Sequence, residues 1–151
     1  MKAKLLTFIF VLLLPHCGFS PIYQTNNESN FNISIINTKG DQYINKLITN
    51  EINKISKNNS KNKINLKINS TFSKEIVSKD TKGSPTEYKL IANVNFEINK
   101  LGKEFQISFT EKQNIKNISD LFEQKNYENT IKRNFASSIV KKLNLELIYK
   151  E

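Results

Sequence analysis

The sequence is poor in the residues from which most catalytic and metal sites are built. Its 151 residues include one histidine, one cysteine, no tryptophan and four glycines. The histidine and the cysteine are neighbours, His16 and Cys17, so the chain beyond them contains neither residue type. That part of the chain cannot form a Ser-His-Asp triad, a Cys-His pair or a zinc site of the usual ligands. So few glycines also argue against a phosphate-binding loop, and we expect no enzyme activity and no cofactor.

Arginine is almost absent, although the chain is basic. Lysine and arginine together number 23 against 14 acidic residues, which gives a net charge of +9, and Arg133 is the only arginine. A lysine-rich surface attracts nucleic acid, anionic lipid or phosphorylated saccharide, or it simply keeps the protein soluble. Recognition of bases and phosphates by two parallel hydrogen bonds relies mainly on arginine. Nucleic acid is therefore the least expected of these partners.

The longest apolar run lies at the N-terminus. Lys2 and Lys4 precede an almost wholly apolar segment, Leu5 to Leu14, which Pro15 ends. A short basic region followed by about 7–15 apolar residues is typical of a secretory signal peptide. A transmembrane helix is the alternative, but it needs about 20 apolar residues, and this run is shorter. We therefore assign residues 1–16 as a signal peptide and expect the rest of the chain to be exported.

The single cysteine follows that segment directly. Cys17 has Leu14 three residues before it, an arrangement that resembles the lipobox of bacterial lipoproteins, in which the cysteine is acylated and becomes the first mature residue. His16 departs from the small residue that the lipobox has at this place. A buried or disulfide-bonded thiol is the alternative, although a lone cysteine has no intramolecular disulfide partner. Several acyl chains would anchor the protein firmly, with residues 17–30, which include the polar stretch QTNNESN, as the tether.

The first half of the remaining chain predicts one helix between two strands. Alternating apolar residues indicate a strand that begins at Phe31 and ends at Gly40. Asp41 is a candidate N-cap of the following helix, in which apolar residues recur at spacings of three and four (Ile44, Leu47, Ile48, Ile52 and Ile55). In this pattern Asn45 falls on the polar side of the helix. After a turn at 56–62, alternation predicts a second strand (Ile64, Leu66, Ile68 and Phe72).

The second half predicts two further strands and a second helix. Residues 78–85 (SKDTKGSP) have the composition of a turn. A long third strand follows (Tyr88, Leu90, Ala92, Val94, Phe96 and Ile98) and, after a turn at Gly102, a fourth (Phe105, Ile107 and Phe109). Residues 114–124 are expected to form a loop with a short helical turn capped by Ser119 or Asp120. A helix over about 126–145 is predicted from apolar residues at every fourth position (Tyr127, Ile131, Phe135, Ile139 and Leu143).

These elements predict a single α+β domain over residues 31–151. Their order is strand, helix, three strands, helix, and short turns between strands favour an antiparallel four-stranded sheet. Both amphipathic helices would bury their apolar sides on one face of that sheet, which gives a two-layer sandwich. Phe96, Phe105 and Phe135 are expected in its core.

The residues that follow the signal carry a more specific resemblance. Cys17 to Tyr23 (CGFSPIY) is similar to the C-G-F-x-P-L-Y opening of the LPS-assembly lipoprotein family, LptE, particularly its alphaproteobacterial branch. The order of elements is also similar, as are Asn45 to Leu47 (NKL) in the first helix and Tyr88 to Leu90 (YKL) at the start of the third strand. The resemblance covers essentially the whole chain beyond Cys17. His16 and the surface rich in lysine and asparagine depart from the family.

The resemblance implies a role without catalysis. Members of the family sit as a plug inside the large β-barrel subunit (LptD type) of the lipopolysaccharide translocon, help that barrel to fold and contact lipopolysaccharide during its transport. For this chain, the resemblance implies lipid attachment at Cys17 on the periplasmic side of the outer membrane, because Gly18 replaces the aspartate associated with retention at the inner membrane. The alternative is a general outer-membrane lipoprotein that acts as a structural adaptor in the cell envelope.

Two lysines are candidates for contact with lipopolysaccharide. Lys79 and Lys82 flank the turn between the second and third predicted strands. Their ammonium groups are suited to the phosphates and acidic sugars of such a ligand. A merely solvated loop is the alternative reading of the same residues.

Overall fold

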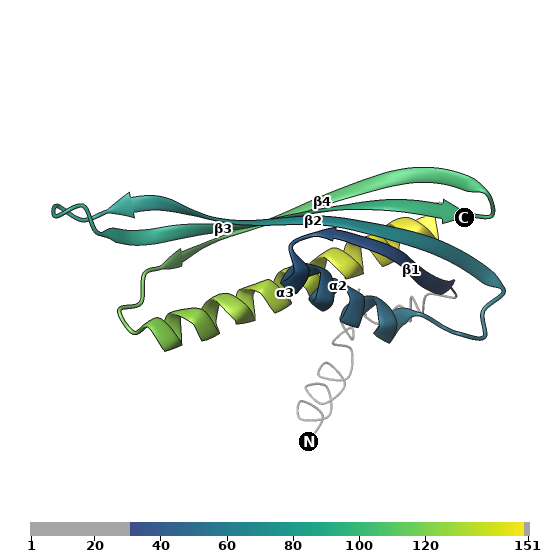
Figure 1. Ribbon diagram of the computed structural model, residues 1–151, viewed down its shortest axis with the longest axis horizontal. Helices are drawn as coiled ribbons and strands as arrows, with labels where there is room; N and C mark the ends of the chain where they lie inside the picture. The colour runs from purple at the N-terminus through teal and green to yellow at the C-terminus, as the bar shows by residue number, and fades with distance from the viewer. Residues whose placement is uncertain (1–30, 150–151) are drawn as a thin grey trace, which may run out of the picture.

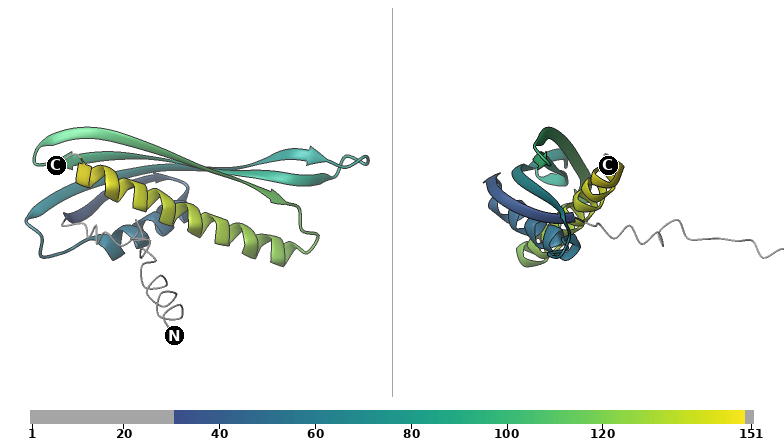
Figure 2. Two further views of the ribbon diagram at one scale, coloured as in Figure 1. Left: turned by 180° about the vertical axis from the view of Figure 1, so that it is seen from behind. Right: turned by 90° about the vertical axis from the view of Figure 1, so that its right-hand side faces the viewer.

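The computed structural model describes residues 31–149, so Cys17, the predicted signal peptide and the predicted tether lie outside the described residues. The described chain forms six elements (Figure 1): β1 (Phe31–Gly40), α2 (Gln42–Ile55), β2 (Asn62–Lys79), β3 (Pro85–Lys100), β4 (Lys103–Lys116) and α3 (Leu121–Tyr149). The four strands form one sheet in the order β1-β2-β3-β4, and both helices lie on the same side of it (Figure 2). The predicted two-layer α+β sandwich and the predicted order of elements are confirmed.

The sheet is antiparallel except at its first strand. β2 pairs with β3, and β3 with β4, as antiparallel neighbours, whereas β1 runs parallel to β2. The reason is that α2 lies between β1 and β2 in the sequence, and a helix packed on the sheet carries the chain back to the end at which β1 began. The predicted antiparallel sheet therefore holds for β2 to β4 but not for β1.

Gly40 and Asp41 make a tight connection from β1 to α2. Gly40 has a φ of +89°, which glycine adopts without a steric penalty, and a Cβ added to it would lie 1.8 Å from the carbonyl oxygen of Ser70. The same carbonyl accepts a hydrogen bond from the Asp41 N–H at 3.0 Å. Asp41 then caps α2 as predicted, because its Oδ1 accepts from the Ile44 N–H at 2.8 Å.

The core lies between the sheet and the two helices. Its larger part is formed beneath α2 and the second half of α3, and a smaller cluster beneath the first half of α3 consists of Leu90, Ala92, Ile115, Ile131 and Phe135. Phe96 is fully buried, Phe135 is 5% exposed, and Phe105 packs half-buried against the larger cluster. The predicted core placement is confirmed for Phe96 and Phe135, whereas Phe105 packs against the core and stays partly exposed.

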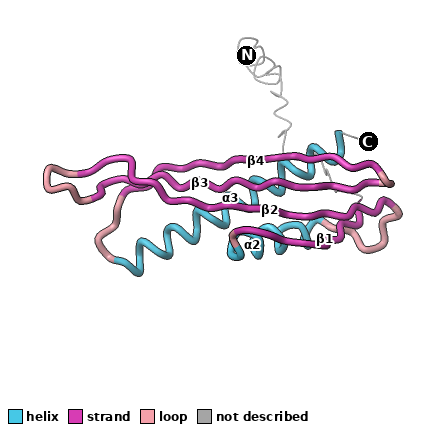
Figure 3. The backbone as a smooth tube through the Cα atoms, turned by 45° about the horizontal axis from the view of Figure 1, so that its top comes forward, coloured by secondary structure: helices cyan, strands magenta, loops and turns pink. Residues whose placement is uncertain are grey.

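Several elements extend beyond the residues that the sequence pattern indicated. β2 continues to Lys79 and β3 begins at Pro85, so their hairpin projects past the helices (Figure 3). No helix covers the end of this hairpin, and its residues therefore lack the alternation that marks the rest of both strands. β4 runs to Lys116, and α3 begins at Leu121, where a loop up to residue 124 was expected. Asp120, one of the two predicted caps, accepts from the Glu123 N–H at 2.8 Å.

Two helical residues, Asn45 and Tyr127, do not lie on the side of the helix that the sequence pattern predicts. Asn45, expected on the polar side of α2, is buried, because its Nδ2 donates to the Lys39 carbonyl at 2.8 Å and closes the end of β1 against the helix. Tyr127, expected in the apolar stripe of α3, is 40% exposed. Gln124 and Glu128 take the inward positions of the first turns of α3, because they lie at helical spacing from the buried Ile131.

Candidate binding surfaces

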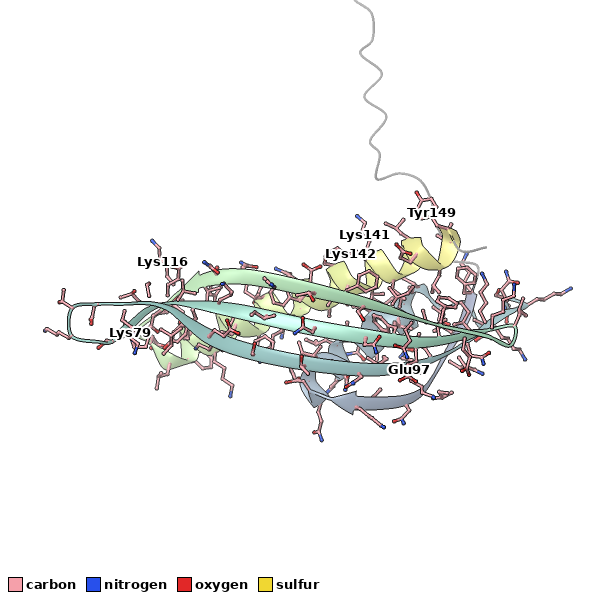
Figure 4. All side chains as sticks on the ribbon, turned by 90° about the horizontal axis from the view of Figure 1, so that it is seen from above. Lys79, Glu97, Lys116, Lys141, Lys142 and Tyr149 are labelled. Carbon is pink, nitrogen blue, oxygen red and sulfur yellow. The ribbon has the colours of Figure 1, made fainter. Side chains whose placement is uncertain are left out.

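The two lysines predicted to contact lipopolysaccharide lie together at the tip of the β2–β3 hairpin. Lys79 ends β2, Lys82 lies in the following turn, and both are exposed (Figure 4 labels Lys79). Asp80 lies between them and closes the turn, because its Oδ1 accepts from the Lys82 N–H at 2.9 Å and from the Ser84 N–H at 2.8 Å. The turn is thus held by its own hydrogen bonds, and one carboxylate partly offsets the two ammonium charges.

A chain of polar contacts ties the base of this hairpin to the start of α3. The buried Gln124 accepts from the Ile118 N–H at 2.7 Å and donates to Glu128 Oε1 at 2.8 Å. The Nζ of Lys74, on β2, lies 2.5 Å from the same oxygen of Glu128 and 3.9 Å from the centre of the Tyr88 ring. These contacts fix the position of the hairpin relative to the helix.

The carboxylate of Glu128 is stabilised in its charged form. Partial burial raises its pKa, but the hydrogen bonds from Lys74 and Gln124 and the positive charge of Lys74 outweigh burial, so the pKa lies below its usual value. Glu128 therefore remains an anion at neutral pH, and its ion pair with Lys74 stays in place.

A second tie joins β4 to α3 farther along the helix. Glu111 Oε1 accepts from Ser138 Oγ at 2.7 Å and lies 2.7 Å from Lys142 Nζ. Burial raises the pKa of Glu111, and the hydrogen bonds from Lys142 and Ser138 more than compensate, so its pKa is also below the usual value.

We did not predict Glu111 or Glu128 from the sequence. The sequence could have indicated them, because each glutamate occupies a position that faces the core in its strand or helix, where an apolar residue is expected.

The face of the sheet away from the helices is polar. Its side chains are mainly amides and hydroxyls that hydrogen-bond across neighbouring strands: Thr110 with Asn93 at 2.7 Å, Ser108 with Asn95 at 3.2 Å, and Asn93 with Thr71 at 3.4 Å. Lys67 and Glu97 form an ion pair on the same face, with 3.3 Å between Nζ and Oε2. Burying so many polar groups in hydrocarbon would be costly, so this polar sheet face is suited to water or to a polar protein wall.

Within residues 31–149, no three His, Cys, Asp or Glu side chains are grouped so that they could hold a metal ion. In the same residues, no helix combines the length and the apolar character needed to span a membrane.

Comparison with known proteins identifies the fold. Neither protein-family models nor curated sequences match the chain. The crystal structure of rare lipoprotein B from Shewanella oneidensis matches with a TM-score of 0.55 and 15% identity, over 80% of this chain and 98% of that one. A proposed lipoprotein from Caulobacter crescentus matches with a TM-score of 0.52 and 12% identity, over 83% and 96% of the two chains. The chain therefore has the fold of these bacterial lipoproteins.

Proposed function

We propose that this protein is an outer-membrane lipoprotein of the lipopolysaccharide transport machinery, anchored through Cys17 on the periplasmic side, and that it plugs the translocon β-barrel and helps it to assemble. The observation that carries the proposal is the joint occurrence of the CGFSPIY opening and a fold shared with two bacterial lipoproteins. The opening motif and the fold are separate features of the chain, and both point to the same class of protein.

The shape of the domain supports a position along the axis of a barrel. β2 has 18 residues and β3 has 16, and a strand rises about 3.3 Å per residue, so the hairpin is roughly 55–60 Å long. A bilayer with its headgroups is about 40–45 Å thick. The domain is only two layers deep across this long axis (Figure 2), so a single copy can extend from one membrane surface to the other within a large barrel.

The surface of the domain supports the same position. The lumen of outer-membrane barrels is polar, and the polar sheet face offers amides and hydroxyls that can hydrogen-bond to such a wall. At the far end of the hairpin, Lys79 and Lys82 would meet the phosphates of lipopolysaccharide. A plug performs no reaction, and this agrees with a chain that has neither histidine nor cysteine beyond residue 17.

Co-purification tests the proposal. The mature protein with a C-terminal tag, extracted from outer membranes in mild detergent, is expected to recover one large β-barrel protein in equal molar amount. The double variant Lys79→Ala/Lys82→Ala is expected to retain the barrel and to recover less lipopolysaccharide with it. Recovery of the protein alone, or with cell-wall material, would support the adaptor role instead and contradict the proposal.

A further inference from the structure

The end of the domain opposite to the hairpin tip is strongly basic. The loop from α2 to β2, the turn from β3 to β4 and the strand ends that adjoin them carry five lysines and no acidic residue: Lys57, Lys61, Lys63, Lys100 and Lys103. We call these lysines the basic end. Lys57, Lys61, Lys63 and Lys103 are exposed, whereas the ammonium nitrogen of Lys100 is buried. Glu104, which follows Lys103 on β4, offsets one of these charges and leaves the region with an excess of positive charge.

The two segments that form the basic end lie side by side although they are about forty residues apart in the sequence. Ile64, which follows Lys63, pairs with Lys100 in the register of β2 and β3. Lys100 Nζ lies 4.9 Å from the centre of the Phe31 ring, and the Lys57 N–H donates to the Phe31 carbonyl at 2.8 Å. Phe31 is the first described residue, so the described chain begins at the basic end.

Two exposed apolar or amphipathic side chains accompany the lysines. Leu101 is 79% exposed in the turn between Lys100 and Lys103, and Tyr149 is 82% exposed at the end of α3. Leu101 has a φ of +52°, a conformation in which glycine or asparagine is usual. The end of α3 and this turn lie at the same end of the domain (Figure 1), although Figure 4 shows them apart from one another. A leucine that is largely exposed in an unfavourable backbone conformation is available for a contact outside the domain.

The hairpin end does not share this excess of charge. Its lysines, which include Lys79, Lys82 and Lys116, are accompanied by Asp80 and Glu87 on the hairpin and by Asp120 and Glu123 at the start of α3. Positive charge is therefore concentrated at the end of the domain where the described chain begins. An anionic surface would orient the molecule with this end toward it.

We propose that the basic end, with Leu101 and Tyr149, rests on the headgroups of an anionic phospholipid membrane. Lysine ammoniums are attracted to such a surface within about one Debye length, and leucine and tyrosine side chains bury readily at the level of the headgroups. Residues 18–30 span at most about 45 Å when extended, so a lipid on Cys17 would keep this end near the bilayer. That last step rests on the lipid anchor of the proposed function, whereas the attraction to anionic headgroups does not.

The absence of tryptophan from the sequence provides a direct test. Single tryptophans are introduced into the mature lipidated protein as Leu101→Trp and, as a second and conservative probe, Tyr149→Trp. Thr81→Trp, at the exposed hairpin turn, is the matched control. Each variant is reconstituted with vesicles of equal parts phosphatidylglycerol and phosphatidylcholine, or with vesicles of phosphatidylcholine alone.

We expect both probes at the basic end, but not Thr81→Trp, to shift their emission to shorter wavelength on the anionic vesicles and to lose emission when brominated lipids are used. In 1 M salt, where the Debye length falls to about 3 Å, the shift should largely disappear. The added changes Lys61→Gln, Lys63→Gln and Lys103→Gln should also remove it. If the emission of both probes on anionic vesicles equals that on phosphatidylcholine, or if Thr81→Trp shifts as much, the proposal is overturned. The test involves no barrel, so its result is independent of the co-purification experiment.

Discussion

Replacing Phe135 by alanine is expected to lower the free energy of unfolding by about 3–5 kcal/mol. Phe135 lies on α3 and packs in the smaller core cluster with Leu90, Ala92, Ile115 and Ile131. Removal of its ring would leave a cavity between the helix and the sheet, which the strands cannot close because continuous pairing holds β3 in register with both neighbours around Leu90 and Ala92. The first half of α3 would then lose its main apolar anchor.

Thermal unfolding measured by circular dichroism checks this prediction. For a domain of this size the expected loss corresponds to a melting temperature roughly 10–20 °C lower than that of the unaltered protein. Phe122→Ala is the matched control, because it makes the same change on the same helix at a side chain that is 75% exposed. It should alter stability by no more than about 0.5 kcal/mol. Equal melting temperatures for the two variants would refute the placement of Phe135 in the core.

Gly40→Ala is the second substitution from which a large loss of stability is expected. The added Cβ would lie 1.8 Å from the Ser70 carbonyl oxygen, which belongs to the backbone and cannot rotate away. The positive φ alone costs about 1–3 kcal/mol for a non-glycine residue. Displacement of the Ser70 carbonyl would also break its hydrogen bond with the Asp41 N–H, which costs about 1–3 kcal/mol more. The variant should therefore be destabilised by about 2–6 kcal/mol.

Gly83→Ala separates the steric clash from the backbone strain. Gly83 has a φ of +84°, almost the same as that of Gly40, but a Cβ added there meets nothing within 4 Å. Chemical denaturation of the two variants should show a clearly larger loss for Gly40→Ala. If both variants lose the same stability, the close approach between β1 and β2 at Gly40 does not constrain the fold.

The hydrophobic pattern of the sequence predicted the helices and strands that bury one side. It did not predict segments of which neither side is buried. β3 was predicted from Tyr88 to Ile98 because its inward residues all meet the core. The end of the β2–β3 hairpin was missed because no helix covers it, so nothing selects apolar residues for one face. The parallel pairing of β1 with β2 depends on the path of the chain through α2. The alternation of apolar residues within one strand gives no information about the direction of the neighbouring strand.

The candidate surfaces could be predicted from the sequence only where residues that are close together in the chain form them. Lys79 and Lys82 share one turn, and the turn composition identified their position. The basic end was not predicted, because its two lysine segments meet only through the pairing of Ile64 with Lys100. The Lys74–Glu128 ion pair likewise joins residues that are 54 positions apart. Such sites depend on the register of the sheet and require the structure.

The proposed plug and the proposed membrane contact describe one orientation of the molecule. With the basic end at the headgroups of the periplasmic leaflet, the long axis of the domain would point across the membrane, and Lys79 and Lys82 would lie roughly 55–60 Å away at the far end of the hairpin. Phospholipid contact and lipopolysaccharide contact would then occur at opposite ends of the domain.

The central claim is that the barrel encloses the domain, and crosslinking from two opposite faces tests it most directly. A photoreactive phenylalanine derivative is placed in cells at Ser108, on the polar sheet face, or at Asn134, on the exposed side of α3. An adaptor that docks through one surface would react with a given partner from one face only. Our account predicts that irradiation joins both positions to the same large outer-membrane β-barrel, and adducts from only one face, or with different partners from the two faces, would contradict it.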